Sequence, residues 1–193
     1  MTSREKVDRI LAESGSKRER IMLLGALLAR ESRSGVIVVG GSAIEVYTRS
    51  GYVSGDVDVV GERAHLEPLL ASWGFAKWPG LWIREDWGLA VDIRGPNYTG
   101  DVGRTRTITT PYGAVRLAAP EDLLVKRLAE AQHWKVKEAV AIAALLYAAE
   151  REDFDWAYAE GVAKQRGVSM KLLSDFRRRV EAVPVGASPP EPE

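Results

Sequence analysis

Two aspartates on one apolar segment are the feature of the sequence that best predicts chemistry. Asp56 and Asp58 are two residues apart in a segment that alternates polar and apolar residues up to Val60, as a half-buried strand does. Alternate residues of a strand face the same side, so both carboxylates share one face while Val57 and Val59 point into the core. Two carboxylates held side by side repel each other unless a cation neutralises them or one takes up a proton.

Asp92 is a third acid in similar surroundings. It lies within the otherwise apolar segment 89–93, where a lone carboxylate is costly to bury. On a strand beside Asp56 and Asp58 it would supply a third ligand, and three hard oxygen donors favour Mg²⁺ or Mn²⁺ over zinc. Such a site can hold two ions about 4 Å apart and support in-line phosphoryl transfer. We therefore predict that these three residues are the metal ligands and the catalytic residues.

A glycine turn precedes the acids. The β-branched run 36–39 predicts a buried strand that enters a tight turn at Gly40 and Gly41. Missing side chains let a backbone approach a phosphate closely, and the N-terminus of a following helix offers free N–H groups. We expect Ser42 to cap that helix, from Ala43 to about residue 49, and to add a hydroxyl donor. Acids after a turn are often simply solvated, and paired glycines often serve packing alone, but their joint occurrence favours a metal and nucleotide site.

In these residues the chain resembles the nucleotidyltransferase superfamily related to DNA polymerase beta. The signature of that superfamily is a hydrophobic residue, Gly, Gly or Ser, a spacer, Asp-hydrophobic-Asp and a third acid on a later strand. Here it reads Val39-Gly40-Gly41-Ser42, Asp56-Val57-Asp58-Val59 and Asp92, and the resemblance covers about residues 20 to 130. With Ser54 two residues before Asp56, the chain looks more closely like small prokaryotic enzymes that include abortive-infection and toxin–antitoxin nucleotidyltransferases.

The resemblance implies transfer of a nucleoside monophosphate from NTP to a hydroxyl acceptor, with release of pyrophosphate. The acceptor would be RNA such as tRNA, a protein or a small molecule. Gly40, Gly41 and Ser42 would hold the triphosphate, and Asp92 would bind the second ion and help to activate the acceptor hydroxyl. Lys126 matches a family lysine that reaches the triphosphate, although a lysine near a helix start is more often simply exposed.

Two departures from the family pattern weaken the match to the toxin-type branch. Tyr52 stands where relatives often carry Arg, four residues before the first acid. Segment 135–138 offers no match for the later Asp of the toxin-type enzymes. The alternative is a catalytically silent binding module, or an antitoxin, whose C-terminal helices contact a protein partner. Dinucleotide binding is disfavoured because the turn at residues 40–45 lacks the Gly-x-Gly-x-x-Gly spacing.

The pattern of elements predicts an α+β fold, with a mixed sheet flanked by helices and followed by a C-terminal helical bundle. Helices are expected in the first thirty residues and from His65 to Trp73. Strand candidates are 36–39, 56–60, 75–78, 81–84, 89–93, 104–110 and 114–117. We predict three parts: a nucleotidyltransferase core with N-terminal helices (1–118), a helical region (119–182) and a Pro-rich, acidic, disordered tail (183–193).

Composition narrows the function classes. Twenty-seven basic side chains balance twenty-seven acidic ones in 193 residues, which gives no support to broad, non-specific binding of nucleic acid. The chain has no cysteine, so disulfides, thiolate zinc sites and cysteine nucleophiles are excluded. The N-terminus has no signal-peptide pattern, and no apolar run reaches the roughly 18 residues of a membrane span. We expect a cytoplasmic protein.

His65 and His133 have no partner at a metal or triad spacing, and the basic pair Arg104 and Arg106 is expected to be a solvated strand face.

Overall fold

The computed structural model describes residues 1–184, and these fall into two compact units that divide between Ala118 and Ala119. The predicted tail lies outside the described residues from position 185 on.

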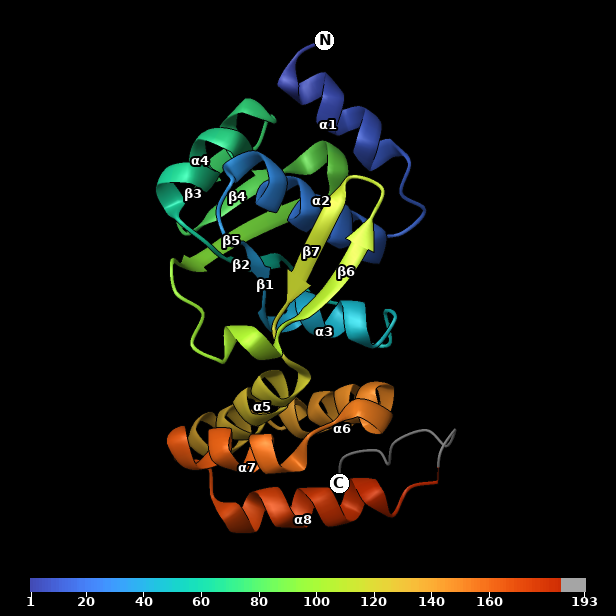
Figure 1. The fold of residues 1–193 in the computed structure, drawn as a ribbon, viewed down its shortest axis with the longest axis vertical. Helices are drawn as coiled ribbons and strands as arrows, with labels where there is room; N and C mark the ends of the chain where they lie inside the picture. Colours follow the sequence, from blue (N-terminus) through green and yellow to red (C-terminus); the bar gives the residue numbers. More distant parts are fainter. Residues whose placement is uncertain (185–193) are drawn as a thin grey trace. The chain divides into compact units, whose positions relative to one another are not determined.

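The first unit is built on a seven-stranded mixed sheet with the strand order β3-β4-β5-β2-β1-β7-β6 (Figure 1). Its strands are β1 (Ile37–Val38), β2 (Val57–Val60), β3 (Ala76–Trp78), β4 (Leu81–Arg84), β5 (Leu89–Gly95), β6 (Arg106–Thr110) and β7 (Gly113–Leu117). Two neighbouring pairs are parallel, β2 with β5 and β1 with β7, and the other pairs are antiparallel. The predicted α+β class is confirmed.

Four α-helices complete the first unit: α1 (Ser3–Ala12), α2 (Lys17–Ser32), α3 (Gly40–Tyr47) and α4 (Arg63–Ser72). Two short 3₁₀ turns, Glu85–Trp87 and Val102–Arg104, connect strands. Thr2 and Glu5 form a capping box at the start of α1, and Ser16 caps α2 through its side chain. Helix α2 packs so closely on β1 and β7 that a side chain at Gly25 would collide with Val38 and Val115. Helix α2 therefore forms part of the hydrophobic core against the sheet.

The predicted start of the helix after the glycine turn is wrong. Helix α3 begins at Gly40 rather than at Ala43, and its N-cap is Val39, which makes no side-chain capping bond. Gly40 has a φ of +59°, in the left-handed region that favours glycine, so the chain can turn from β1 directly into the helix. Ser42 lies inside the first turn, and its hydroxyl bonds to backbone groups of Val39 and Asp58.

The second unit is helical, as expected, with α5 (Pro120–Trp134), α6 (Glu138–Glu150), α7 (Trp156–Gln165) and α8 (Met170–Glu181), and a 3₁₀ turn at Arg151–Asp153. Proline opens α5, while Asp155 and Ser169 cap α7 and α8 through their side chains. An aromatic cluster packs α6 against α7 and α8: Tyr147, Phe154, Trp156 and Phe176. Within residues 1–184, no helix is both long and apolar enough to span a membrane.

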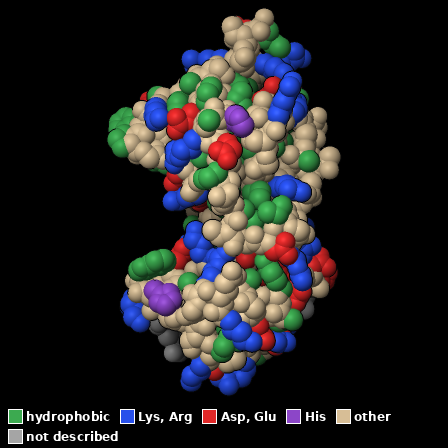
Figure 2. All heavy atoms as spheres, turned by 60° about the vertical axis from the view of Figure 1, so that its left-hand side comes forward, with side chains coloured by type: hydrophobic (Ala, Val, Ile, Leu, Met, Phe, Trp, Pro, Cys, Tyr) green, Lys and Arg blue, Asp and Glu red, His purple; other side chains and the backbone are tan. Residues whose placement is uncertain are grey.

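Charged side chains of both signs are mixed over the face of each unit that Figure 2 shows. This distribution agrees with the equal numbers of acidic and basic residues in the sequence. Neither unit presents a broad surface of one sign in that view.

Candidate active site

Two adjacent parallel strands bring the three predicted metal-ligand residues together. Asp58 on β2 and Asp92 on β5 are register partners, and Asp56 immediately precedes β2. Each aspartate can offer one carboxylate oxygen such that the three oxygens lie within 4.8 Å of one another. Asp58 is buried, while Asp56 and Asp92 are half-buried. Side-chain alternation thus places the carboxylates on one face, with Val57 and Val59 in the core.

The glycine turn holds Asp58 through a set of short-range hydrogen bonds. The Gly41 N–H donates to Oδ2 of Asp58 over 3.2 Å, and the Val39 N–H donates to the Asp58 carbonyl over 2.9 Å. The N–H of Asp58 in turn donates to the Ser42 hydroxyl over 3.0 Å, and that hydroxyl donates to the Val39 carbonyl over 2.9 Å. The hydroxyl of Ser42 therefore joins α3 to β2, and its predicted contact with a phosphate stays a prediction.

The two glycines of the turn are closely packed against neighbouring side chains. A Cβ at Gly40 would collide with the Asp58 carboxylate, and one at Gly41 would lie 3.2 Å from the hydroxyl oxygen of Tyr52 and 3.1 Å from Cβ of Ser54. Tyr52, the residue that departs from the family pattern, therefore has its hydroxyl beside the turn. The predicted phosphate-binding segment is thus in contact with Asp58, one of the three acids.

Arg94 is a functional candidate that the sequence patterns did not reveal. Its Nη2 and Nε atoms each lie 2.6 Å from Oδ1 of Asp58, and its Nη1 lies 3.1 Å from Oδ2 of Asp92. The strand was expected to end at Ile93, but β5 continues to Gly95, which puts Arg94 on the same face as Asp92. The i, i+2 spacing of Asp92 and Arg94 was the available signal.

The electrostatics of the site favour a cation. Burial raises the pKa of Asp56 above its ordinary value, and the negative charge of Asp58 raises it further, against the opposing effect of Arg94. The charge of Asp92 adds to the increase. Three carboxylates face one guanidinium, so the cluster keeps an excess of negative charge when all three acids are ionised. Oxygen ligands at this separation suit a hard divalent ion such as Mg²⁺ or Mn²⁺.

The other residues singled out in the sequence lie on other elements. Lys126 is on α5 of the second unit, where it is exposed. His65 and His133 are exposed on α4 and α5. Arg104 ends a 3₁₀ turn and Arg106 begins β6. The predicted role of Lys126 in nucleotide binding stays a prediction.

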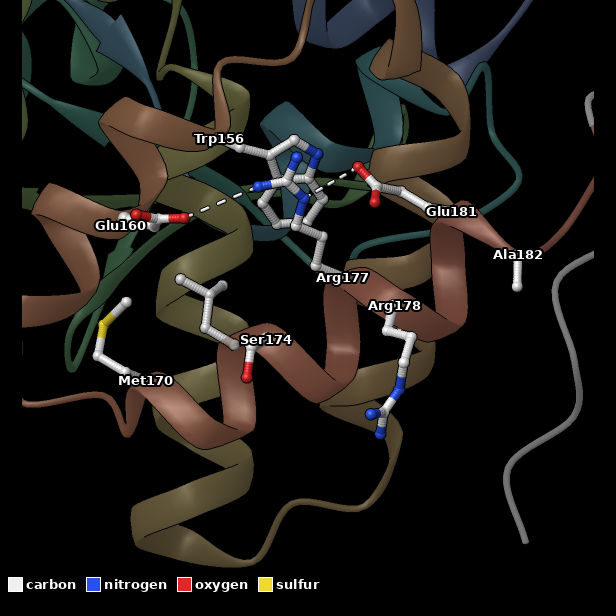
Figure 3. Close-up of a pocket in the computed structure, with 9 residues that line it drawn as sticks. Trp156, Glu160, Met170, Ser174, Arg177, Arg178, Glu181 and Ala182 are labelled. Atoms are coloured by element: carbon white, nitrogen blue, oxygen red, sulfur yellow. Dashed lines mark hydrogen bonds and ion pairs between the residues drawn. The ribbon is translucent and has the colours of Figure 1, made fainter.

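A pocket of about 370 Å³ lies between α7 and α8 in the second unit (Figure 3). Its most prominent polar side chain, Arg177, lies over the ring of Trp156, 5.1 Å from its centre. Arg177 also forms ion pairs with Glu181 at 3.0 Å and with Glu160 at 3.8 Å. The charged groups at the centre of this pocket thus satisfy one another, and the acid cluster of the first unit is the stronger candidate.

Comparisons with known proteins found similarity at the level of structure. No protein-family model and no curated protein sequence matches the chain. A solution structure of the antibiotic-resistance factor ANT(2'')-Ia matches with a TM-score of 0.54 and 14% identity, over 83% of this chain and 95% of that one. A crystal structure of ANT(2'')-Ia in complex with adenylyl-2''-tobramycin matches with a TM-score of 0.52 and 17% identity, over 83% and 98%. At this identity, the likeness shows a shared fold.

Proposed function

We propose that this chain, which has the fold of the nucleotidyltransferase superfamily, is an enzyme that transfers a nucleoside monophosphate from NTP to a hydroxyl group. The observation that carries the proposal is the convergence of Asp56, Asp58 and Asp92 beside the glycine turn. The fold is shared with an aminoglycoside nucleotidyltransferase, and the family signature falls on these same residues. Fold and local chemistry therefore point to one activity.

In the proposed reaction, the acceptor oxygen forms a bond to the α-phosphorus of the NTP while the bond from that phosphorus to the bridging oxygen breaks. Pyrophosphate leaves with the bonding electrons, and the hydroxyl proton passes to solvent water. A divalent ion, Mg²⁺ or Mn²⁺, bound by the three aspartates would lower the pKa of the attacking hydroxyl and stabilise charge on the leaving group.

Each residue of the site has a proposed part. Asp56 and Asp58 would hold the ions that position the triphosphate, and Asp92 would bind the second ion and help to activate the acceptor hydroxyl. Gly40 and Gly41 allow close approach of the phosphates to the backbone at the start of α3. Lys126 is proposed to contact the triphosphate.

The proposed acceptor is a small molecule, RNA such as tRNA, or a protein. The structural neighbour was solved with adenylyl-2''-tobramycin, in which an adenylyl group is joined to an aminoglycoside, and this favours a small-molecule hydroxyl for testing first. The resemblance to toxin–antitoxin and abortive-infection enzymes is the reason to include RNA and protein. The proposed place of action is the cytoplasm, where NTP is available.

The decisive experiment is incorporation of label from each of the four α-³²P-labelled NTPs in the presence of Mg²⁺ or Mn²⁺. Separate reactions contain tobramycin, total cellular RNA or the protein alone. We expect label in one acceptor class with stoichiometric pyrophosphate release, and no label for Asp58→Asn. Label that persists in Asp58→Asn would overturn the proposed site, and the absence of label with every acceptor would favour the alternative below.

A second function, a catalytically silent binding module, is favoured by one observation. Arg94 neutralises part of the charge of Asp58 and Asp92, so the acids have a partner within the protein itself. In that case the helical second unit would contact a protein partner, as an antitoxin does. Calorimetric titration separates the two functions, because the module predicts no metal-dependent binding of NTP.

A further inference from the structure

We infer that Arg94 competes with the divalent ion for the carboxylates of Asp58 and Asp92, so that metal binding is weak until a nucleotide arrives with it. The inference rests on the proposed function, and it concerns how the site is filled. Four features support it: the different partners of the two Asp58 oxygens, the contact of the same guanidinium with Asp92, the exposure of Arg94 and the charge of the triphosphate.

The two carboxylate oxygens of Asp58 have different partners. Oδ2 accepts the hydrogen bond of the Gly41 N–H, whereas Oδ1 accepts a hydrogen bond from Nε of Arg94 and forms an ion pair with its Nη2. The oxygen of Asp58 that the backbone leaves available is therefore the one that Arg94 contacts. A divalent ion on that oxygen would lie against the guanidinium, and two cations at such a distance repel strongly.

Asp92 is held by the same guanidinium. Its Oδ2 lies 3.1 Å from Nη1 of Arg94, so Arg94 bridges the two strands that carry the metal ligands. The two carboxylates share the planar, fork-shaped group of an arginine, which a lysine ammonium cannot reproduce. Filling the metal site thus requires that this bridge opens.

The exposure of Arg94 determines how easily the bridge opens. The side chain of Arg94 is 51% exposed, in contrast to 7% for Asp58. A long, half-exposed side chain can move into water without disturbing the core, so the bridge opens at modest cost. Asp58 stays in place because hydrogen bonds from the glycine turn and the strand backbone hold it independently of Arg94.

The charge of the nucleotide links it to the bridge. A displaced guanidinium beside the acids is a ready partner for a triphosphate, because arginine binds phosphate oxygens with paired hydrogen bonds. When the metal ion arrives with the nucleotide, the phosphate oxygens replace the carboxylates as hydrogen-bond partners of Arg94. A bare metal ion offers the guanidinium no such partner. Arg94 therefore couples the two ligands positively, and each ligand raises the affinity for the other by the same factor.

The test measures Mn²⁺ affinity directly, by electron paramagnetic resonance of free Mn²⁺, with and without a non-hydrolysable NTP analogue. We expect Arg94→Ala to bind bare Mn²⁺ roughly tenfold more tightly than the wild type and to lose most of the increase that the analogue causes. Arg94→Lys keeps the charge but not the fork, so its bare-metal affinity should lie between the two. Arg9→Ala, which removes an exposed charge on α1, should leave both affinities unchanged.

The outcomes separate this inference from the proposed function. Unchanged or weaker Mn²⁺ binding by Arg94→Ala, in protein with native circular dichroism, overturns the competition while label incorporation by the wild type still supports the enzyme. Arg94→Lys supplies the same comparison if the alanine variant does not fold. The absence of Mn²⁺ binding in the wild type and in every variant overturns both proposals.

Discussion

The carboxylate of Asp58 lies in the space that a side chain at Gly40 would fill. Gly40 also has a left-handed φ of +59°, which costs other residues about 1–2 kcal/mol. Gly40→Ala therefore combines backbone strain with displacement of a metal ligand. We expect a lower midpoint of thermal unfolding and at least about a tenfold loss of label incorporation, since 1.4 kcal/mol in the barrier is a factor of ten.

A matched glycine is available for this experiment. Gly35, just before β1, has open space where a methyl group would lie and no left-handed φ. Gly35→Ala should retain the unfolding midpoint and the activity of the wild type. Wild-type activity in Gly40→Ala would contradict the close approach of the turn to Asp58.

Substitution of Ser42 distinguishes a structural role of its hydroxyl from a role in binding the nucleotide. Its hydroxyl is fully buried, accepts from the Asp58 N–H and donates to the Val39 carbonyl. Ser42→Ala leaves a buried backbone donor without that partner, and we expect a loss of about 1–3 kcal/mol in the free energy of unfolding, measured with urea. Ser72→Ala, at an exposed hydroxyl near the end of α4, should change stability little. A raised KM for NTP with unchanged stability would instead assign Ser42 to the phosphates.

Metal binding at the acids should be visible in thermal stability. A ligand that binds only the native protein stabilises it by about 2.7 kcal/mol at a hundred times its dissociation constant. Mn²⁺ should therefore raise the unfolding midpoint of the wild type, and EDTA should reverse the increase. Asp58→Asn, which keeps the shape of the side chain, should abolish it.

The exposed acid Glu62 provides the control for the metal experiment. Glu62 precedes α4 and makes no side-chain cap, so Glu62→Gln removes one negative charge of the first unit without touching the cluster. Mn²⁺ should raise the unfolding midpoint of Glu62→Gln by as much as it raises that of the wild type. An equal response of Asp58→Asn would mean that Mn²⁺ binds elsewhere.

The local patterns of the sequence predicted much of this architecture because they reflect strand and helix periodicity. Alternation of polar and apolar residues placed Asp56 and Asp58 on one face, and turn residues marked the β3–β4 hairpin. The α+β fold was confirmed by the structure and by its likeness to a nucleotidyltransferase. These features depend on residues that are close in the chain.

The parts that the sequence did not predict depend on contacts between distant segments. The predicted start of α3 was wrong because Ser42 does not cap the helix. Its hydroxyl instead accepts a hydrogen bond from the backbone N–H of Asp58, sixteen positions away. Arg94 was missed because the apolar pattern of β5 stops at Ile93, whereas pairing with β2 extends the strand to Gly95. Tertiary pairing overrode the local signal in both cases.

A buried arginine away from the site predicts a pH-dependent stability difference. Arg84 is buried and contacts both carboxylate oxygens of Asp86 at 3.0 Å. This hydrogen bonding lowers the pKa of Asp86 below its ordinary value of 3.8. A lowered pKa means that the ionised carboxylate stabilises the fold above pH 3.8, and that this contribution is lost as the pH falls through the lowered value.

The measurement compares Asp86→Asn with the wild type by urea unfolding at about pH 7 and about pH 3. The side chain of Asp86 is about half exposed, so we expect a loss below about 1 kcal/mol at neutral pH that shrinks at the acidic pH. Glu85→Gln removes the exposed neighbouring acid and should show no such difference. Equal stability of Asp86→Asn and the wild type at neutral pH would contradict the ion pair.

The proposed contact of Lys126 with the triphosphate can be tested by substitution. Its side chain is exposed on α5, while Leu124, Val125 and Leu128 are buried, so a substitution should leave the fold intact. If Lys126 contacts the triphosphate, Lys126→Ala should raise the KM for NTP about tenfold at an unchanged unfolding midpoint, as expected for the loss of one charge-assisted hydrogen bond. Lys164→Ala, which removes an exposed lysine from α7, should leave the KM unchanged, because the resemblance assigns that residue no contact. An unchanged KM in Lys126→Ala would contradict the proposed contact of Lys126 with the triphosphate.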